Sequence, residues 1–325
     1  MEHYITQVRI KKLRHLQNID IQLNKNRRQH LILTGKNGSG KTTLIEAIRS
    51  NLDVINGIQY INSEMDSLNT GIDIQLSNQS DIDAAFSSGS FITAFFGAKR
   101  ALQVQVPEGV ERIIPEKTYS INDNPSEKLL KYMVHLKAQQ SFANNEKHVQ
   151  TSQLIQNWFT LFENALKKLM DDSTVWLEFS FQDYNFIIHQ NHREPYDFTQ
   201  LSDGYSAALQ IVADLLMRMD NNWLRKNTSI DLKEEGIVLI DEIETHLHLE
   251  LQKTIMPFLT EMFPNIQFIV TTHSPFVVIS VPDAAIFDLE NHTFVKNGLS
   301  DVGYEGAVSG CFPNLQCFVD NVETK

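Results

Sequence analysis

A run of glycines, a lysine and a threonine near the N-terminus has the composition of a loop that binds phosphate through its backbone. The run matches G-x-x-x-x-G-K-[ST], and its candidate binding residues are Gly35, Asn37, Gly38, Ser39, Gly40, Lys41, Thr42 and Thr43. Glycines let the chain turn so that successive N–H groups point at one anion, and the N-terminus of a following helix adds its positive end. We expect Lys41 to reach the β- and γ-phosphates of a nucleotide, and the Thr42 hydroxyl to ligate Mg²⁺. A glycine-rich turn with an incidental lysine is the alternative, and the buried strand and amphipathic helix expected on either side argue against it.

Two adjacent carboxylates follow a second apolar run. Residues 237–240 are apolar and lead directly to Asp241 and Glu242. A carboxylate at the end of a buried strand is costly unless it serves a cation, so we expect Asp241 to hold Mg²⁺. Glu242 is then placed to orient or deprotonate an attacking water molecule. A carboxylate pair that caps the next helix is the alternative, which the phosphate-binding pattern makes less favourable.

A histidine and a serine–glycine pair occupy two further positions of interest. His273 follows the apolar run 266–271, and side chains at the carboxyl ends of such strands lie at the ligand-binding edge of a sheet. We expect it to contact the γ-phosphate or the attacking water. Ser202, Asp203 and Gly204 open a long helix, where a cap leaves backbone N–H groups free for an anion. An ordinary helix cap is the alternative for this last set.

The elements that must position these residues alternate along the chain. Alternating apolar and polar residues predict strands at 4–10 and 19–23, and apolar runs predict buried strands at 30–34, 91–96, 237–240 and 266–271. Helical segments between the later runs indicate a parallel α/β core. Helical periodicity predicts a small lobe from 125 to about 171 and a long helix from 205 to about 219, with a strand hairpin at 176–188 between them.

Composition narrows the classes of protein further. The chain has 325 residues, of which 42% are hydrophobic and 21% are charged, as in ordinary globular proteins. It has no secretion signal at its start and no apolar run near the roughly 20 residues that span a bilayer, so we expect a cytoplasmic protein without a membrane partner.

The net charge of −12 argues against a dedicated duplex-DNA binder. The basic stretches 9–14 and 25–28 are interpreted as solvated surface, and the two cysteines, at 311 and 317, as buried or free thiols.

The four motifs, in this order, resemble the Walker A, signature, Walker B and switch-histidine motifs of ABC-type ATPases. The resemblance implies an α/β ABC-ATPase head with a central, mainly parallel sheet, an N-terminal antiparallel sheet and a small helical lobe. It also implies ATP and Mg²⁺ as ligands and hydrolysis of ATP as the reaction. In that family Ser202 and Gly204 would act in trans, in a head-to-head homodimer with two ATP molecules at the interface.

We expect four parts along the chain. These are a nucleotide-binding lobe at 1–124, a helical lobe at 125–175, the second part of the ATPase core at 176–297 and a C-terminal tail at 298–325.

The segment after Glu242 resembles the soluble RecF and OLD branch of the family. It reads EIETHLH, close to the DEIExHLHP pattern of that branch, although Leu249 replaces the usual proline. Arg14 matches the basic residue that this branch places near the adenine, and a plain surface arginine is the alternative. About 160 residues separate Thr42 from Ser202, without the heptads of a long coiled coil. Only 52 residues follow His273, too few for the Toprim nuclease of OLD enzymes.

Within this branch the sequence is similar to the PtuA-like ATPases of Septu and retron-associated anti-phage systems. The likeness extends to about residue 297 and is carried by LILTGKNGSGKTTLIEAI, FFGAKR, LSDGYSAAL, GIVLIDEIETHLHLELQ and FPNIQFIVTTHSPFVV. Members of the family generally continue beyond that region, so we expect either a short member or the head of a longer ATPase.

The same resemblance implies partners. It implies a separate HNH nuclease and, in retrons, a reverse transcriptase with its DNA–RNA product, so that nucleic acid can lie nearby. Two alternatives remain open. A RecF-like DNA-repair ATPase would show turnover that DNA stimulates. A binding module in which ATP locks an assembly would show a long dimer lifetime with negligible phosphate release.

Overall fold

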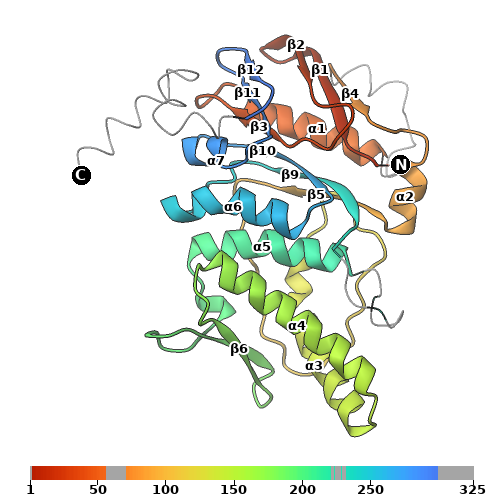
Figure 1. Cartoon of the computed structure of the whole chain (residues 1–325), viewed down its shortest axis with the longest axis vertical. Helices are drawn as coiled ribbons and strands as arrows, with labels where there is room; N and C mark the ends of the chain where they lie inside the picture. Colours follow the sequence, from red (N-terminus) through yellow and green to blue (C-terminus); the bar gives the residue numbers. More distant parts are fainter. Residues whose placement is uncertain (1, 56–70, 221–222, 224–227, 229–231, 299–325) are drawn as a thin grey trace. The chain divides into compact units, whose positions relative to one another are not determined.

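The computed structural model describes residues 2–55, 71–220, 223, 228 and 232–298 (Figure 1). These residues form two compact units. Of the described residues, the first unit takes those up to Lys99, Ser120–Asn122 and those from Glu235 onward, and the second takes Arg100–Tyr119 and Asp123–Glu234. Both cysteines and, apart from Gly298, the predicted C-terminal tail lie outside the described residues.

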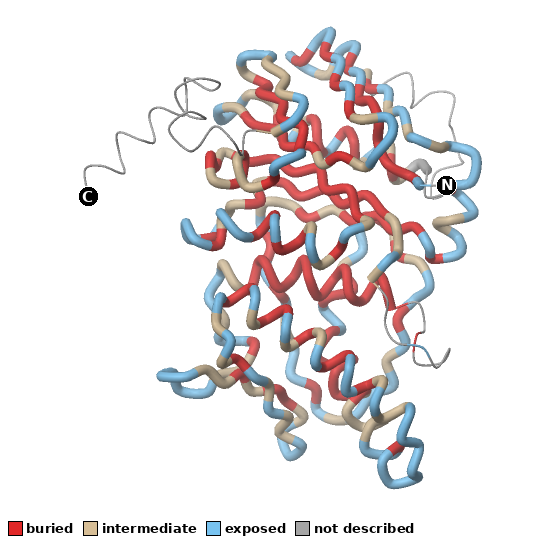
Figure 2. Tube along the Cα trace, viewed as in Figure 1, coloured by how far each residue is buried: buried red, intermediate tan, exposed pale blue. Residues whose placement is uncertain are grey.

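The first unit contains a six-stranded sheet that carries the site. Its order is β12-β11-β3-β10-β9-β5, and neighbouring strands are parallel except for the pair β11–β12. The strands are β3 (Leu31–Thr34), β5 (Phe91–Phe96), β9 (Glu235–Ile240), β10 (Ile266–Thr271), β11 (Ala285–Asp288) and β12 (Thr293–Val295). Every residue of β3 and β10 is buried, which explains why these strands are mostly apolar (Figure 2). Gln267 of β10 is the polar exception in the interior of a strand, and its side chain bonds the backbone of Ile5 and Gln29. The predicted parallel α/β core is confirmed.

The predicted N-terminal antiparallel sheet is also confirmed. It has the order β2-β1-β4, with β1 (Ile5–Leu13), β2 (Leu16–Gln22) and β4 (Ile72–Leu76). The helices of the unit are α1 (Lys41–Ile55), α2 (Ile82–Ser88), α6 (Leu249–Met262) and α7 (Pro275–Ile279). The short helix α2 was not predicted, because the segment from 51 to 90 is rich in polar residues.

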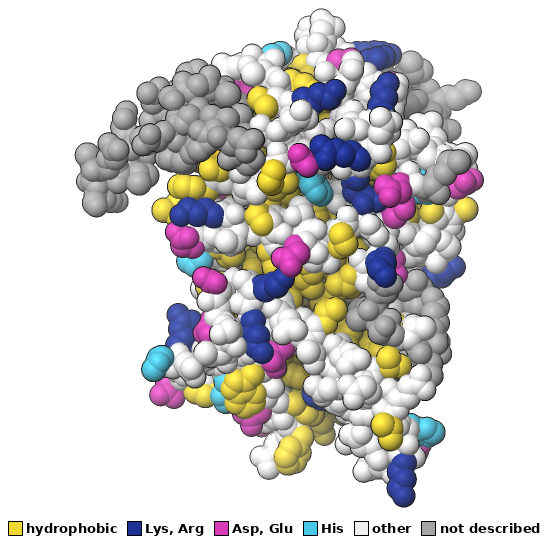
Figure 3. Space-filling model, viewed as in Figure 1, with side chains coloured by type: hydrophobic (Ala, Val, Ile, Leu, Met, Phe, Trp, Pro, Cys, Tyr) yellow, Lys and Arg dark blue, Asp and Glu magenta, His cyan; other side chains and the backbone are white. Residues whose placement is uncertain are grey.

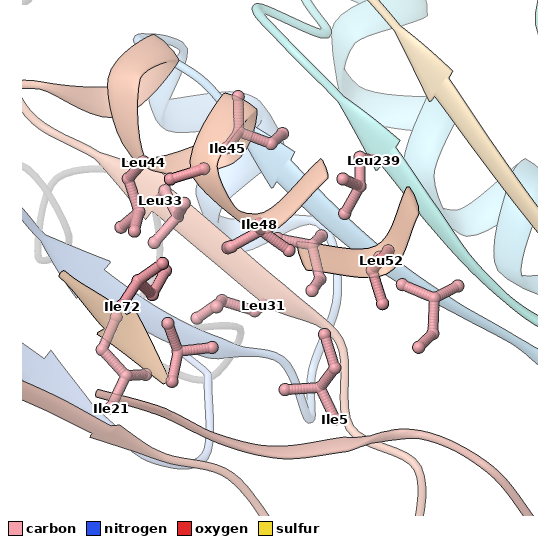
Figure 4. Close-up of a cluster of buried hydrophobic side chains, with 14 of the residues drawn as sticks. Ile5, Ile21, Leu31, Leu33, Leu44, Ile45, Ile48, Leu52, Ile72 and Leu239 are labelled. Atoms are coloured by element: carbon pink, nitrogen blue, oxygen red, sulfur yellow. The ribbon is translucent and has the colours of Figure 1, made fainter. Parts of the chain in front are cut away.

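One buried cluster joins α1 to both sheets (Figure 4). Leu44, Ile45 and Ile48 of α1 meet residues of the antiparallel sheet such as Ile21, and residues of the parallel sheet such as Leu239. Burying each of these large aliphatic side chains contributes about 1.5–3 kcal/mol. The cluster therefore fixes the start of α1 at the carboxyl end of β3, which the phosphate loop requires.

Arg9, the first residue of the basic stretch on β1, lies between two acidic residues of the sheet. It is opposite Asp20 of β2 and Asp73 of β4. Cross-strand pairs of opposite charge stabilise a solvated sheet face. Among the described side chains on the face drawn in Figure 3, basic and acidic groups are both present.

The second unit is organised around a helical hairpin and aromatic side chains. Its elements are η1 (Pro125–Lys128), α3 (Leu129–Asn145), α4 (Val149–Leu169), β6 (Trp176–Ser180), β7 (Asn185–His189), β8 (Tyr196–Asp197), η2 (Phe198–Gln200) and α5 (Asp203–Arg218). Trp158 stacks on Phe162 with ring centroids 5.5 Å apart, and Phe159 stacks on Phe186 of β7 at 5.7 Å. The predicted helical lobe and strand hairpin are therefore both present.

The far end of α5 is held by buried polar contacts within the second unit. Arg218 Nε donates to Asp214 Oδ1 over 2.5 Å, and both side chains are almost fully buried. Tyr132 of α3 donates to the Asp220 carboxylate, which also accepts from Trp223 Nε1 over 3.0 Å. These bonds fix the helix whose N-terminus carries the predicted signature residues. Among all the described helices, none is both long and apolar enough to cross a membrane.

His30 gives the first unit a measurable pH dependence. It precedes β3, and its Nδ1 accepts a hydrogen bond from the Phe268 amide over 3.1 Å. Burial, and secondarily the charge of Arg28, lowers the pKa of His30 to about 4. As the pH falls, the His30 ring of the unfolded chain takes up a proton before the ring of the folded chain does. The contribution of His30 to the free energy of unfolding is therefore complete above about pH 6.5 and is lost between about pH 6.5 and pH 4.

We predict that His30→Asn, which keeps an acceptor for the Phe268 amide, weakens this pH dependence. Wild-type protein should lose about 2–3 kcal/mol more than the variant between pH 7.5 and pH 4.5, because about 1.4 kcal/mol accompanies each pKa unit. Urea unfolding at the two pH values measures the difference. His192→Asn, at an exposed histidine, is the control and should lose as much stability as wild type. If His30→Asn also lost as much stability as wild type between the two pH values, His30 would not be the source of the pH dependence.

Candidate functional site

The predicted motifs of the first unit meet at one edge of its parallel sheet. The loops that follow β3, β9 and β10 lie together because these strands are parallel neighbours (Figure 1). They surround a cleft of about 250 Å³. Its lining residues are Arg14, His15, Asn37, Gly38, Gly40, Lys41, Thr42, Thr43, Glu242 and His273.

The glycine-rich loop turns into α1 as the sequence pattern requires. Gly35, Gly38 and Gly40 have φ values of 133°, 83° and 100°, a region that residues with a Cβ rarely adopt. An added Cβ at Gly40 would also lie 3.1 Å from the His15 ring, so a side chain there would require the ring to shift. The glycines at these positions therefore set the path of the loop.

Lys41 is buried at the first position of α1 and closes the loop. Its Nζ donates to the carbonyl oxygens of Gly35 and Lys36 over 2.7 and 3.1 Å. Burial lowers the pKa of Lys41, and nearby carboxylates, Glu244 first among them, oppose that shift. A buried ammonium group whose present acceptors are only backbone carbonyls can exchange them for the oxygens of a more strongly charged ligand.

Ser39 shows that the loop fits such a ligand. Its hydroxyl oxygen is shielded from solvent and has no hydrogen-bond partner. A shielded polar atom without a partner costs about 1–3 kcal/mol. A phosphate oxygen held by the loop would remove this cost, so the donor set suits a phosphate.

Thr42 and Asp241, the two predicted metal ligands, are in direct contact. Thr42 Oγ1 donates to Asp241 Oδ2 over 3.0 Å, and the Asp241 side chain is buried. Hydroxyl and carboxylate oxygens are the ligands that Mg²⁺ prefers. The pair therefore has the chemistry of a magnesium site beside the phosphate loop.

Glu242 adopts a backbone conformation that is rare for its residue type. Its φ is +47°, and a residue with a Cβ in the left-handed region carries about 1–2 kcal/mol of strain. Its N–H donates to Thr271 Oγ1 over 2.7 Å, and the next N–H, of Ile243, donates to the Thr271 carbonyl over 3.1 Å. Strained residues of this kind cluster at functional sites.

His273 lies at the same cleft, after the end of β10. Burial and then the charge of Lys41 lower the pKa of His273, so the ring is neutral at pH 7 and can donate one hydrogen bond and accept another. Its backbone N–H donates to Glu244 Oε1. Glu244 thus connects the loop after β9 to the loop after β10.

Arg14 belongs to the turn between β1 and β2. It lines the cleft, and its Nη1 lies 3.5 Å from Thr43 Oγ1. The neighbouring His15 places Nε2 3.1 Å from the Ser39 carbonyl oxygen. Arg14 is therefore next to the phosphate loop, as a residue near a bound nucleotide must be.

The structure adds three residues that the sequence reasoning missed. His15, Glu244 and Thr271 all contact predicted site residues. Thr271 had a recognisable signal, because it is polar and ends a buried apolar strand, as Asp241 does. Glu244 also had one, because it is the second glutamate of the DEIExHLHP pattern. His15 had none, because its contact joins segments far apart in the sequence.

Ser202, Asp203 and Gly204 lie in the second unit, at the start of α5. Ser202 is the N-cap residue, yet its side chain makes no capping hydrogen bond. Ser202 and Asp203 are both exposed. The helix start therefore presents a hydroxyl and backbone N–H groups to solvent, which is the arrangement an anion can use.

Known proteins similar to this chain include several ATPases. One family model, described as "AAA domain, putative AbiEii toxin, Type IV TA system", matches residues 90–280, and one described as "ABC transporter" matches residues 16–91. The retron Ec83 probable ATPase of Escherichia coli is 43% identical over 110 residues, which are 34% of this chain and 19% of that relative. The Septu protein PtuA of Bacillus mycoides is 26% identical over 305 residues, or 88% of this chain and 40% of that relative.

Among solved structures, an Smc head bound to the C-terminal winged-helix domain of ScpA aligns with 92% of this chain and 99% of its own, at 13% identity and a TM-score of 0.46. The chain spans less than half the length of the two curated relatives described above. The chain is similar to PtuA and the retron probable ATPases, and its N-terminal part matches the ABC-transporter model. Because the first model covers more than half of its length, the chain belongs to the AAA-domain family that this model describes.

Proposed function

We propose that this chain binds ATP with Mg²⁺, dimerises head to head around it, hydrolyses it, and thereby regulates a partner nuclease in anti-phage defence. The observation that carries the proposal is the meeting of Lys41, the Thr42–Asp241 pair, Glu242 and His273 around one cleft. A cationic side chain, a hydroxyl–carboxylate pair, a second carboxylate and an imidazole at one cleft are the groups that phosphoanhydride hydrolysis would use.

The phosphate loop and Lys41 would bind the triphosphate. The loop supplies backbone N–H groups at the start of α1, and Lys41 supplies a buried positive charge. Gly35, Asn37, Gly38, Ser39, Gly40 and Thr43 complete the contacts expected of the loop. Arg14, beside Thr43, would lie against the base or ribose.

Thr42 and Asp241 would hold the metal ion. When bound, Mg²⁺ neutralises charge on the β- and γ-phosphates and helps to orient them for attack. Asp241 is buried, so its carboxylate keeps a fixed orientation toward the Thr42 hydroxyl.

Glu242 and His273 would act on the water and the γ-phosphate. Glu242 lines the cleft, and its carboxylate accepts a hydrogen bond from Thr245 Oγ1 over 3.3 Å. An ionised carboxylate can accept several hydrogen bonds, one of which would come from the water molecule. As water attacks phosphorus and the bond to the leaving ADP oxygen breaks, Glu242 would take the proton. The neutral His273 ring would donate a hydrogen bond to the γ-phosphate.

Ser202, Asp203 and Gly204 would complete the site of a second copy. The exposure of Ser202 and Asp203 at a helix start supports a role in trans, because an exposed helix N-terminus can meet an anion held elsewhere. Two such copies would enclose two ATP molecules. Hydrolysis would then reopen the dimer.

The defence role rests on the names of the relatives. Septu PtuA and the retron ATPases are the proteins to which this chain is similar. A separate HNH nuclease would be the effector, and in a retron-like system a reverse transcriptase with its DNA–RNA product would be a further partner.

We predict that Lys41→Ala removes detectable ATP binding. Loss of charged hydrogen bonds worth about 1.5–3 kcal/mol each should weaken binding about 100-fold or more. Lys36→Ala is the matched control, because Lys36 lies in the same loop but its exposed side chain pairs with Glu290. Titration of a fluorescent ATP analogue compares the two variants, and wild-type affinity in Lys41→Ala would refute the phosphate role.

We predict that Glu242→Gln still binds ATP and accumulates as a dimer while hydrolysis falls about 10²–10⁴-fold, because a general base is lost and the binding groups remain. Light scattering with ATP and Mg²⁺ reports the dimer, and phosphate release reports turnover. Adding Ser202→Arg to this variant should abolish the dimer and preserve ATP binding. Hydrolysis by Glu242→Gln at the wild-type rate would refute the base assignment.

A further inference from the structure

The side chain of Thr271 connects the two acidic residues of the site. Thr271 is the last residue of β10 and is fully buried. Its hydroxyl donates to Asp241 Oδ1 over 2.6 Å and accepts from the Glu242 N–H over 2.7 Å. One hydroxyl therefore contacts both the carboxylate expected to hold the metal and the backbone of the residue expected to act as base.

The direction of these two bonds is fixed by chemistry. A backbone N–H can only donate, so the Thr271 oxygen accepts from Glu242 and its single proton is directed to Asp241. The bond from Thr271 therefore fixes the position of Asp241 Oδ1 and orients the carboxylate plane.

The same hydroxyl supports the strained backbone at Glu242. A positive φ at this residue persists only if surrounding contacts determine it. The side chain of Thr271 holds the Glu242 N–H, and its carbonyl oxygen holds the Ile243 N–H over 3.1 Å. Two successive N–H groups bonded to one residue fix the peptide that aims the Glu242 side chain into the cleft.

Thr42 and Thr271 approach Asp241 from different elements. Thr42 Oγ1, from α1, donates to Oδ2 over 3.0 Å, whereas Thr271 Oγ1, from β10, donates to Oδ1 over 2.6 Å. Thr42 lines the cleft and Thr271 does not. A cation in the cleft would draw on the Thr42 oxygen, while the Thr271 bond can persist.

We propose that Thr271 is a positioning residue that orients the Asp241 carboxylate for Mg²⁺ and fixes Glu242 in its left-handed conformation. The inference rests on the proposed function and names a residue that no sequence motif assigned. Thr271 touches neither the nucleotide nor the water, and it acts through the two acids.

The test compares Thr271→Val, which keeps the branched shape and removes the hydroxyl, with Thr271→Ser, which keeps the hydroxyl. For each protein, ATP affinity is measured with Mg²⁺ and with EDTA, and phosphate release is measured across a Mg²⁺ titration. Thr272→Val is the matched control, because Thr272 is equally buried but its hydroxyl accepts from the Ser274 N–H over 3.0 Å.

Thr271→Val should bind ATP in EDTA as wild type does, within about 3-fold, but its gain in affinity from Mg²⁺ should shrink about 5–10-fold. Its kcat should fall about 10–100-fold, and half-maximal turnover should need more Mg²⁺. Thr271→Ser should restore these values to within about 3-fold of wild type, and Thr272→Val should keep the Mg²⁺ gain. A loss of one charged and one neutral hydrogen bond is consistent with effects of this size.

Each outcome decides the proposal. The proposal would be overturned if Thr271→Val kept both the wild-type kcat and the wild-type gain in ATP affinity on adding Mg²⁺. It would also be overturned if Thr271→Val lost the same factor of ATP affinity with and without Mg²⁺, because that result indicates a purely structural role. Failure of Thr271→Ser to restore function would overturn it even if Thr271→Val did not fold. If the wild-type protein itself bound ATP without any Mg²⁺ effect, the proposed function would fail first, which is a distinguishable result.

Discussion

The arrangement of the site depends on how the buried carboxylate of Asp241 is satisfied. An isolated buried carboxylate is strongly unfavourable, and it is tolerated only where donors or a cation face it. Here two threonine hydroxyls face it, Thr42 from the start of α1 and Thr271 from the end of β10. These contacts require α1, β9 and β10 to be in register at one edge of the sheet, so the fold and the site impose the same geometric condition.

The core of the first unit meets that condition. Parallel pairing sets Val270 beside Ile240 and Thr271 beside Leu33, so the residues after each strand emerge together. The aliphatic cluster under α1 prevents the helix from sliding along the strands, because any shift would expose side chains such as Ile45 and Ile48. Hydrophobic packing therefore provides the free energy that holds α1 on the strands, and the hydrogen bonds around Asp241 align α1, β9 and β10 with one another.

The two units present their functional groups in different ways. In the first unit, titratable side chains of the cleft are partly buried, and burial lowers the pKa values of Lys41 and His273. In the second unit, Ser202 and Asp203 are exposed at the start of a helix whose other end is attached to the Asp123 carbonyl oxygen by the Arg218 side chain. A rigid helix with an exposed N-terminus suits a surface that meets a partner, whereas the cleft of the first unit suits a bound ligand.

The sequence was sufficient to predict the parallel core and the phosphate loop. Continuous apolar runs with turn residues on either side favoured buried strands, and the glycine pattern at Gly35–Gly40 favoured a loop with left-handed residues. The helices α2 and α7 and the strands β11 and β12 were not predicted, because such short elements have weak periodicity.

Tertiary structure alone decided which groups touch. Nothing in the local sequence placed His15 against Ser39, Glu244 against the backbone of His273, or Thr271 against Asp241 and Glu242. Each contact joins segments that only strand pairing brings together. Residue type and spacing report what a side chain can do and which element carries it, whereas hydrogen-bond partners across a sheet edge depend on the order and register of strands distant in sequence.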